Sequence, residues 1–130
     1  MTTTRDQGLD VFRQLLPGLV PDQPGITLDD GGFAGELGEH ALEHVFGALW
    51  TRGGLDRRSR SLVTLGILIA LRATDELHIH FQIALRNGLT EDELAEVVYH
   101  SAAYAGHPAA SAARRVGREA LTPHITSARQ

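Results

Sequence analysis

The sequence predicts an all-α protein, a helical bundle in a single domain, and three observations support this class. From residue 35 onward apolar residues recur at steps of three and four, and no segment alternates apolar and polar residues as a half-buried strand does. Start and stop signals for helices separate these periodic segments. The 130 residues fit one domain of ordinary size, and 42% hydrophobic with only 5% aromatic residues predict a core of aliphatic side chains.

The first 35 residues are expected to form a short helix and an irregular arm, because residues 17–35 are rich in proline and glycine. The main domain is expected over residues 36–121. Residues 122–130 are expected to be a frayed tail.

The first helix of the main domain is predicted over residues 36–50, with the Gly53-Gly54 pair as its stop signal. Asp56 is placed to cap the next helix. That helix is apolar nearly all round from Leu62 onward, so we expect it at the centre of the domain or of an oligomer.

Thr74 is placed to cap a third helix, for which Asn87 and Gly88 supply a left-handed stop. Thr90 and Glu93 carry the signature of a capping box, which predicts the start of a fourth helix. That helix is expected to end at the glycine in position 106.

Pro108 suits the first turn of a last helix that is expected to run to Leu121. Five alanines in this segment allow close approach to neighbouring helices.

The composition excludes several classes of function. Cysteine is absent, which excludes disulfides, thiolate metal ligands and cysteine nucleophiles. The net charge of −4 divides into −6 over residues 1–50 and +2 over residues 51–130. The sequence therefore lacks the broad basic surface of a nucleic-acid-binding protein, and no apolar run is long enough to span a bilayer. Neither nucleic acid nor a membrane is an expected partner, and with no secretory signal visible the expected location is the cytoplasm.

Glu76 and His80 lie four residues apart on the third predicted helix, so their side chains share one face. A carboxylate beside an imidazole raises the pKa of the imidazole and fixes its tautomer, as a proton donor or acceptor near neutral pH requires. The alternative is an ordinary exposed helix pair. His78 lies between them in sequence but points to a different face.

His100 and Tyr104 repeat the four-residue step on the fourth helix. Their polar tips are expected near the boundary of the core, where each needs a partner. The alternative is a packed ring whose tip reaches water.

Arg57, Arg58 and Arg60 crowd the start of the central helix, where the helix dipole disfavours cations. Two interpretations stay open. The arginines form ion pairs with the acidic first half of another subunit, or they bind a substrate carboxylate, which suits the fork of a guanidinium group.

No metal or organic cofactor is expected. The segment from Glu76 to His80 lacks the two-histidine spacing of helical zinc peptidases. The sequence also has no phosphate-binding loop, dinucleotide-binding glycine pattern or serine elbow.

Several separated blocks of the sequence, in the expected order, resemble the carboxymuconolactone decarboxylase family. The resemblance covers about residues 36–121. The blocks are Trp50-Thr-Arg-Gly-Gly-Leu55-Asp-Arg-Arg-Ser-Arg60-Ser-Leu62-Val-Thr-Leu, Glu76-Leu-His-Ile-His80, Ala84-Leu-Arg-Asn-Gly88-Leu-Thr90 and Tyr104-Ala-Gly106-His-Pro108-Ala-Ala.

The resemblance implies an all-helical domain of the alkyl hydroperoxidase D-like type that assembles into rings, typically trimers or hexamers, with sites near subunit contacts. Related peroxidases carry Cys-x-x-Cys followed by His, which matches Ala73-x-x-Glu76 and His80 here. Without cysteine, that peroxidase activity is excluded.

The activity implied by the resemblance is the cofactor-independent decarboxylation of 4-carboxymuconolactone to the 3-oxoadipate enol-lactone, in the catabolism of aromatic compounds. Under this hypothesis Arg58 or Arg60 binds a carboxylate, and Glu76 orients His80 as the proton donor.

His100 or Tyr104 is expected to contact the oxyanion that forms, and His78 is included among the substrate-binding residues. The chain departs from the decarboxylase pattern at His78, Gln82 and His107. These departures motivate one alternative, a divergent member that acts on another unsaturated or polyketide-like acid by decarboxylation, isomerisation or ring chemistry. The other alternative is a non-catalytic oligomeric binding protein.

Overall fold

The computed structural model describes the backbone of residues 1–129 and the side chains of residues 1–121. Within residues 1–129 every regular element is a helix and no strand is present, which confirms the all-α prediction. The chain forms two compact units, Met1–Leu55 and Asp56–Gln130. No helix among the described residues combines the length and the apolar character that a bilayer crossing needs.

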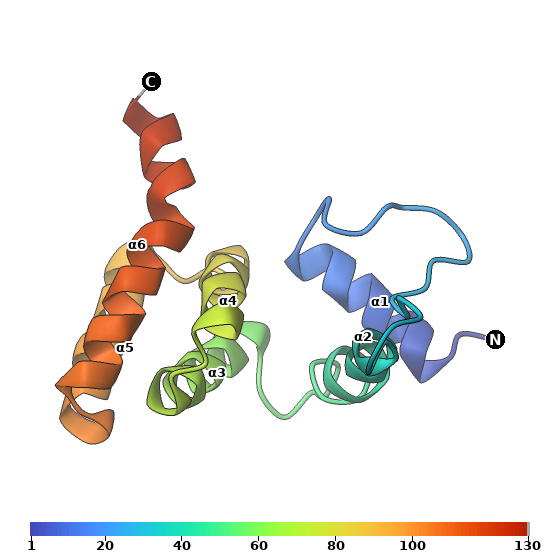
Figure 1. Cartoon of the computed structure of the whole chain (residues 1–130), viewed down its shortest axis with the longest axis horizontal. Coiled ribbons are helices and arrows are strands. Elements are labelled where there is room, and N and C mark those ends of the chain that lie inside the picture. The colour runs from blue at the N-terminus through green and yellow to red at the C-terminus, as the bar shows by residue number, and fades with distance from the viewer. Residues whose placement is uncertain (130) are drawn as a thin grey trace. The chain divides into compact units, whose positions relative to one another are not determined.

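The first unit contains α1 (Thr4–Leu15), α2 (Leu37–Ala41) and η1 (Leu42–Gly47), a π-helical segment that continues α2 (Figure 1). The helix predicted over residues 36–50 is therefore present but changes type along its length, and it ends at Gly47 rather than at Trp50. Helix α1 packs on η1. The two backbones touch at two glycines, because a Cβ atom on Gly8 would overlap the carbonyl oxygen of Leu42 and one on Gly47 would overlap that of Thr4.

The predicted irregular arm lies between α1 and α2, and side chains of α1 hold it. The guanidinium group of Arg5 donates hydrogen bonds to the carbonyl oxygen of Ile26 and, at 3.1 Å, to Glu39. Further along α1, Arg13 donates to the carbonyl oxygen of Pro21 at 2.6 Å. These hydrogen bonds tie the arm to α1 at Pro21 and Ile26.

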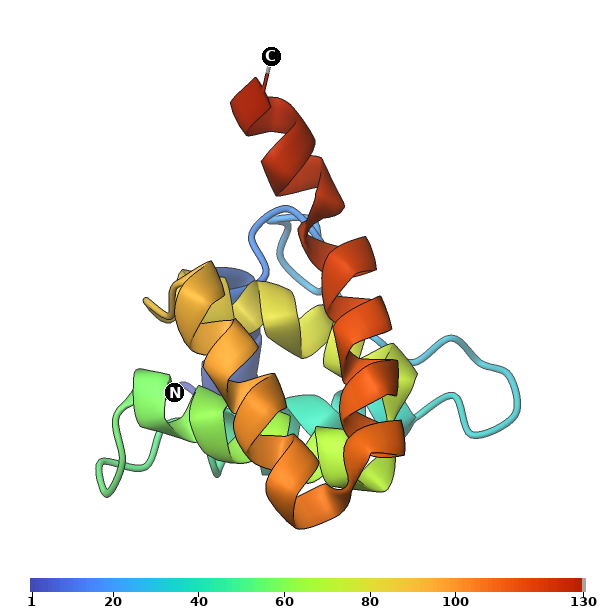
Figure 2. The same cartoon turned by 90° about the vertical axis from the view of Figure 1, so that its left-hand side faces the viewer.

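The second unit contains α3 (Arg57–Leu71), α4 (Thr74–Arg86), α5 (Glu91–Ala105) and α6 (His107–Arg129). Helix α3 packs against each of the other three, and α5 and α6 run side by side from the turn that joins them (Figure 2). The core is aliphatic apart from one phenylalanine, as the composition predicts. Its buried residues are Leu65, Ile69, Leu77, Phe81, Ala84, Leu89, Leu94, Ala109, Ala113, Val116 and Ala120.

Local signals set most of the helix ends in this unit. The side chain of Asp56 accepts a hydrogen bond from the backbone N–H of Ser59 at 2.7 Å, which caps α3. The capping box at Thr90 and Glu93 is present, with reciprocal hydrogen bonds of 3.1 and 3.0 Å. Helix α4 ends before Asn87, and Gly88 follows with a φ of +96°.

Two expected helix ends in the second unit are wrong. Ala73, not Thr74, is the N-cap of α4, and no side chain caps it. The reason is the tight turn after α3, in which Arg72 adopts a left-handed conformation and the N–H of Ala73 bonds back to the carbonyl oxygen of Leu68 at 3.0 Å. Helix α6 continues beyond Leu121 to residue 129, where a frayed tail was expected. Residue 130 lies outside the described part of the chain.

Helix α3 is central but not fully covered. Leu65 and Ile69 are buried in the core, as expected for a helix that is apolar nearly all round. Val63, Ile67 and Leu71, spaced at four residues, are 53%, 53% and 70% exposed. This helix therefore presents one apolar face to the core and a second one to its surroundings.

Candidate functional site

Helix α4 carries the predicted acid–imidazole pair at the edge of the core. Leu77 and Phe81 turn one face of the helix into the core, and His80 lies next to that face. His80 is partly buried and its Nδ1 atom is shielded from solvent, whereas Glu76 is exposed. His78 is partly buried on the same helix. Helix α4 thus carries a sheltered imidazole and, one turn earlier, a solvated carboxylate.

Burial lowers the pKa of His80 below its ordinary value of 6.5. The sequence predicted the opposite direction, a pKa raised by Glu76, and this prediction is wrong. Removal of the ring from water disfavours its charged form. His80 is therefore mainly neutral at neutral pH in the free protein.

Arg58 and Arg60 lie in the first turns of α3, where neighbouring acids offset their charge. Arg58 forms an ion pair with Glu93 of α5. The backbone N–H of Ser59 lowers the pKa of the Asp56 carboxyl by a hydrogen bond, and the charge of Arg58 adds to this effect. Arg60 is partly buried. For Arg58 the ion pair within the chain matches neither of the two interpretations drawn from the sequence.

A polar contact between α3 and α4 fixes which ends of these helices meet. The side-chain amide of Asn87 donates to the hydroxyl oxygen of Ser61 at 2.9 Å and to the carbonyl oxygen of Arg57 at 3.4 Å. Ser61 is 1% exposed, so this contact is inside the unit. The end of α4 therefore lies beside the start of α3.

This register separates the predicted site residues into two groups. The first is Glu76 and His80 on α4, and the second is the arginines of α3 with His100 and Tyr104 of α5. At a rise of 1.5 Å per residue, His80 lies about 10 Å and Glu76 about 16 Å along α4 from Asn87. The arginines at the start of α3 are thus at the opposite end of the α3–α4 pair from Glu76.

The second group surrounds a groove between α3 and α5, which has a volume of about 520 Å³. The rings of His100 and Tyr104 stack with centroids 5.1 Å apart and planes 21° from parallel. Both side chains are exposed, so the prediction that their polar tips lie near the boundary of the core is wrong. Arg58 reaches the same groove through its ion pair with Glu93. The lining residues are Leu62, Gly66, Glu93, Glu96, Val97, His100 and Ser101.

Of the residues that line this α3–α5 groove, sequence reasoning placed only His100 in the site, and Glu96 and Gly66 are two of those it missed. Glu96 precedes His100 by four residues, the same spacing that singled out Glu76 and His80, so that signal was available. Gly66 gives no signal in the sequence, because a glycine inside a helix shows its purpose only when its surroundings are known.

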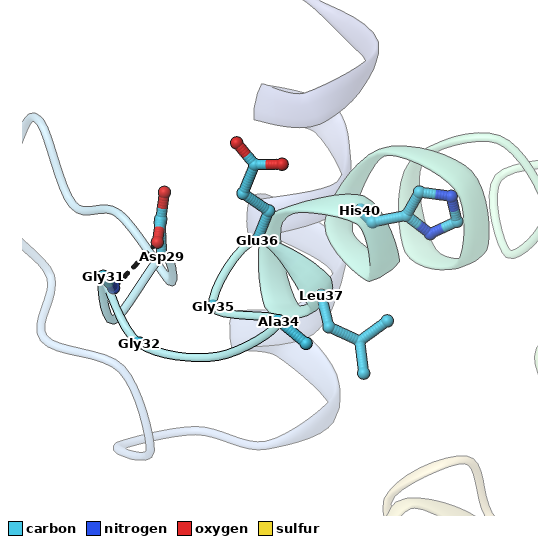
Figure 3. Close-up of a pocket in the computed structure, with 8 residues that line it drawn as sticks. All are labelled: Asp29, Gly31, Gly32, Ala34, Gly35, Glu36, Leu37 and His40. Carbon is cyan, nitrogen blue, oxygen red and sulfur yellow. Dashed lines mark hydrogen bonds between the residues drawn. The ribbon is translucent and has the colours of Figure 1, made fainter.

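Another hollow, of about 580 Å³, lies in the first unit where the arm meets α2 (Figure 3). Asp29 accepts a hydrogen bond from the N–H of Gly31 at 2.9 Å, which closes a turn of the arm. In Figure 3 the side chains of Asp29 and Glu36 extend upward from separate parts of the backbone, and the ring of His40 extends to the right, away from both. The polar groups therefore do not converge on a common point. The described part of the chain likewise holds no group of three acidic or histidine side chains arranged for a metal ion.

The helical bundle of the second unit has the alkyl hydroperoxidase D-like fold. The model of the family described as "Carboxymuconolactone decarboxylase family" matches residues 35–119, and the chain belongs to this family.

Three known proteins are similar to the chain. A 4-carboxymuconolactone decarboxylase of Acinetobacter baylyi is 37% identical over 113 residues, which are 87% of this chain and 83% of that protein. A nitrosuccinic acid decarboxylase of Metarhizium robertsii is 43% identical over 87 residues, 67% of this chain and 61% of that protein. An uncharacterised 15.0 kDa protein of Paracoccus denitrificans is 32% identical over 79 residues, 59% of each chain.

Proposed function

We propose that this chain is a carboxy-lyase that decarboxylates 4-carboxymuconolactone, or a closely similar carboxylated unsaturated lactone, without a cofactor. Family membership and the name of the Acinetobacter relative support a decarboxylase that acts on a small carboxylate. The observation that carries the proposal is the sheltered imidazole of His80 with Glu76 one turn away.

The reaction needs a group that accepts the electron pair left behind by carbon dioxide, and it needs one proton. When the bond between the lactone ring and its carboxylate breaks, carbon dioxide leaves and the electron pair remains in the ring. The ring double bond conjugates that pair to the lactone carbonyl, so the charge rests on oxygen as a dienolate. Addition of a proton to carbon then gives the enol-lactone. The protein must hold the carboxylates, stabilise the oxyanion and deliver that proton.

His80 is the proposed proton donor, and the direction of its pKa shift determines when its ring carries the proton to be donated. Burial lowers this pKa, so the ring of the free protein is mainly neutral at pH 7. A bound anion favours the imidazolium form, because opposite charges stabilise each other in a sheltered site. We therefore expect substrate and proton to bind together, with Glu76 orienting the charged ring from its exposed side.

The arginines at the start of α3 and the residues of the α3–α5 groove are the proposed substrate contacts. His80 does not line this groove, so we propose that it reaches the substrate from another subunit of the homo-oligomer. Arg58, held by Glu93, and Arg60 are the candidates for binding a carboxylate. His100, with Tyr104 stacked on it, is the candidate for the oxyanion contact. His78 on α4 is a further proposed substrate-binding residue.

A second candidate substrate class is favoured by the Metarhizium relative, whose name identifies nitrosuccinic acid as its substrate. Loss of carbon dioxide next to a nitro group also leaves an anion whose charge rests on oxygen. Nitrosuccinic acid and 4-carboxymuconolactone each retain a second carboxylate after the loss. A divergent substrate is thus an acid of this kind, with an electron-accepting group beside the carboxylate that leaves.

The direct test incubates the pure protein with 4-carboxymuconolactone in D₂O and follows loss of the lactone, release of carbon dioxide and deuterium on the product carbon. We expect turnover, with a loss of at least about a hundredfold in His80→Ala, since general acid–base catalysis contributes on this scale. His44→Ala, which removes an exposed histidine of the first unit, is the control and should leave turnover unchanged.

No turnover of the lactone by the wild type would remove the first substrate, and turnover of nitrosuccinic acid alone would establish the second. Equal rates in the wild type and His80→Ala would remove the proposed proton donor. Binding without turnover of either acid would favour a binding protein.

We also propose that the chain forms a homo-oligomer, a trimer or hexamer. The exposed apolar row of Val63, Ile67 and Leu71 on α3 supports this assembly. Light scattering of the pure protein gives the number of chains.

A further inference from the structure

Gly66 is the only described residue of the α3–α5 groove without a side chain, and it lies in the interior of α3. Glycine inside a helix is destabilising by about 1 kcal/mol relative to alanine. Such a residue is explained when its backbone conformation or close packing excludes a Cβ atom. Neither reason applies to Gly66 among the residues that the structure describes.

The backbone at Gly66 is ordinary helix, without the positive φ that Gly88 and Gly106 adopt. A Cβ atom built on Gly66 meets no heavy atom within 4 Å. The contrast is Gly117 of α6, where a Cβ atom would lie 3.3 Å from the ring of Phe81. Packing against the described residues thus explains Gly117 but does not explain Gly66.

Because Gly66 has no side chain, space is left beside the apolar and polar residues that line the α3–α5 groove. Leu62 and Val97 supply apolar wall. His100 lines the groove, and Arg58 forms an ion pair with the lining residue Glu93. A flat ring fits the apolar walls and the imidazole of this groove. The polar lining also includes the carboxylates of Glu93, which Arg58 offsets, and Glu96.

We infer that Gly66 determines the size of substrate that the α3–α5 groove admits, making room for the ring of a cyclic unsaturated acid between α3 and His100. This inference rests on the proposed function and adds a determinant of specificity to it. A methyl group at this position narrows the groove for a ring and obstructs an open-chain acid less.

The test compares wild type, Gly66→Ala and Gly66→Leu with 4-carboxymuconolactone as the cyclic substrate and nitrosuccinic acid as the open-chain one. We expect Gly66→Ala to lower kcat/KM for the lactone about tenfold, and for nitrosuccinic acid less than about threefold, within the range that one methylene controls in a pocket. Gly66→Leu should abolish lactone turnover. Gly54→Ala is the matched control, because its Cβ also meets open space and lies outside the groove.

Thermal unfolding separates this effect from damage to the fold. Gly66→Ala should raise the midpoint by about 2–6 °C, since it improves helix propensity without a clash. Lower lactone turnover in a more stable protein is the expected signature. Equal losses for both acids, or no loss for either, would overturn the inference.

Two further outcomes are decisive. If the wild type turns over neither acid, the proposed function fails, and calorimetric binding of the lactone then tests the inference alone. Equal lactone affinity in the wild type and Gly66→Ala overturns it, and weaker affinity in the variant supports it. A change in the number of chains in Gly66→Ala, measured by light scattering, would assign the space to another subunit and also overturn the inference.

Discussion

Replacing His80 with glutamine should remove a pH dependence from the stability of the protein. Burial holds the pKa of His80 in the folded state below the ordinary 6.5. Above pH 6.5 the ring is neutral in both the folded and the unfolded chain, so its contribution to stability is fully present. As the pH falls below 6.5 the unfolded chain takes up the proton first, which favours unfolding.

The magnitude has an upper limit set by linkage. One proton taken up only by the unfolded chain changes the free energy of unfolding by at most about 1.4 kcal/mol per pH unit. This slope applies between pH 6.5 and the lower pKa of the folded state. Below that lower value both states carry the proton and the slope returns to zero.

Urea unfolding followed by circular dichroism at pH 7.5, 6.5, 5.5 and 5.0 measures the effect. The free energy of unfolding of the wild type should fall more steeply below pH 6.5 than that of His80→Gln. His107→Gln removes an exposed histidine at the start of α6 and should keep the slope of the wild type. Equal slopes in the wild type and His80→Gln would refute the argument that burial governs His80.

Two further substitutions test the packing of each unit. Gly47→Ala should destabilise the first unit by about 3 kcal/mol, because its Cβ overlaps the backbone of α1. Proteolysis at limiting protease measures this loss as faster cleavage. A cleavage rate like that of Gly54→Ala would contradict the close contact. Asn87→Ala should cost about 1–3 kcal/mol in urea unfolding, because the buried Ser61 loses its partner. In combination with Ser61→Ala, the loss should be smaller than the sum of the two single losses, and strict additivity would show that the contact is not energetically coupled.

The sequence alone determined the all-α class and most helix ends in the second unit. Asp56 at the start of α3 and the Thr90–Glu93 box at the start of α5 act within three residues. Such signals are legible because donor and acceptor are close in the chain. The prediction that Thr74 caps α4 failed for a local reason as well. The left-handed Arg72 closes the turn just before it and fixes the backbone there.

The spacing of Glu76 and His80 was likewise legible in the sequence, but their environment was not. A four-residue spacing predicts that two side chains share a helix face, but it does not predict the solvent exposure of either side chain. The tertiary structure decided that His80 is sheltered and Glu76 exposed, and so decided the direction of the pKa shift.

Only tertiary structure could join Arg58 to Glu93, 35 residues away, and show that the space beside Gly66 is open. Both facts depend on how α3 packs against α5. Local sequence specifies each helix by hydrogen bonds within a few residues, whereas burial, long-range ion pairs and the volume of a groove arise when helices from distant parts of the chain meet.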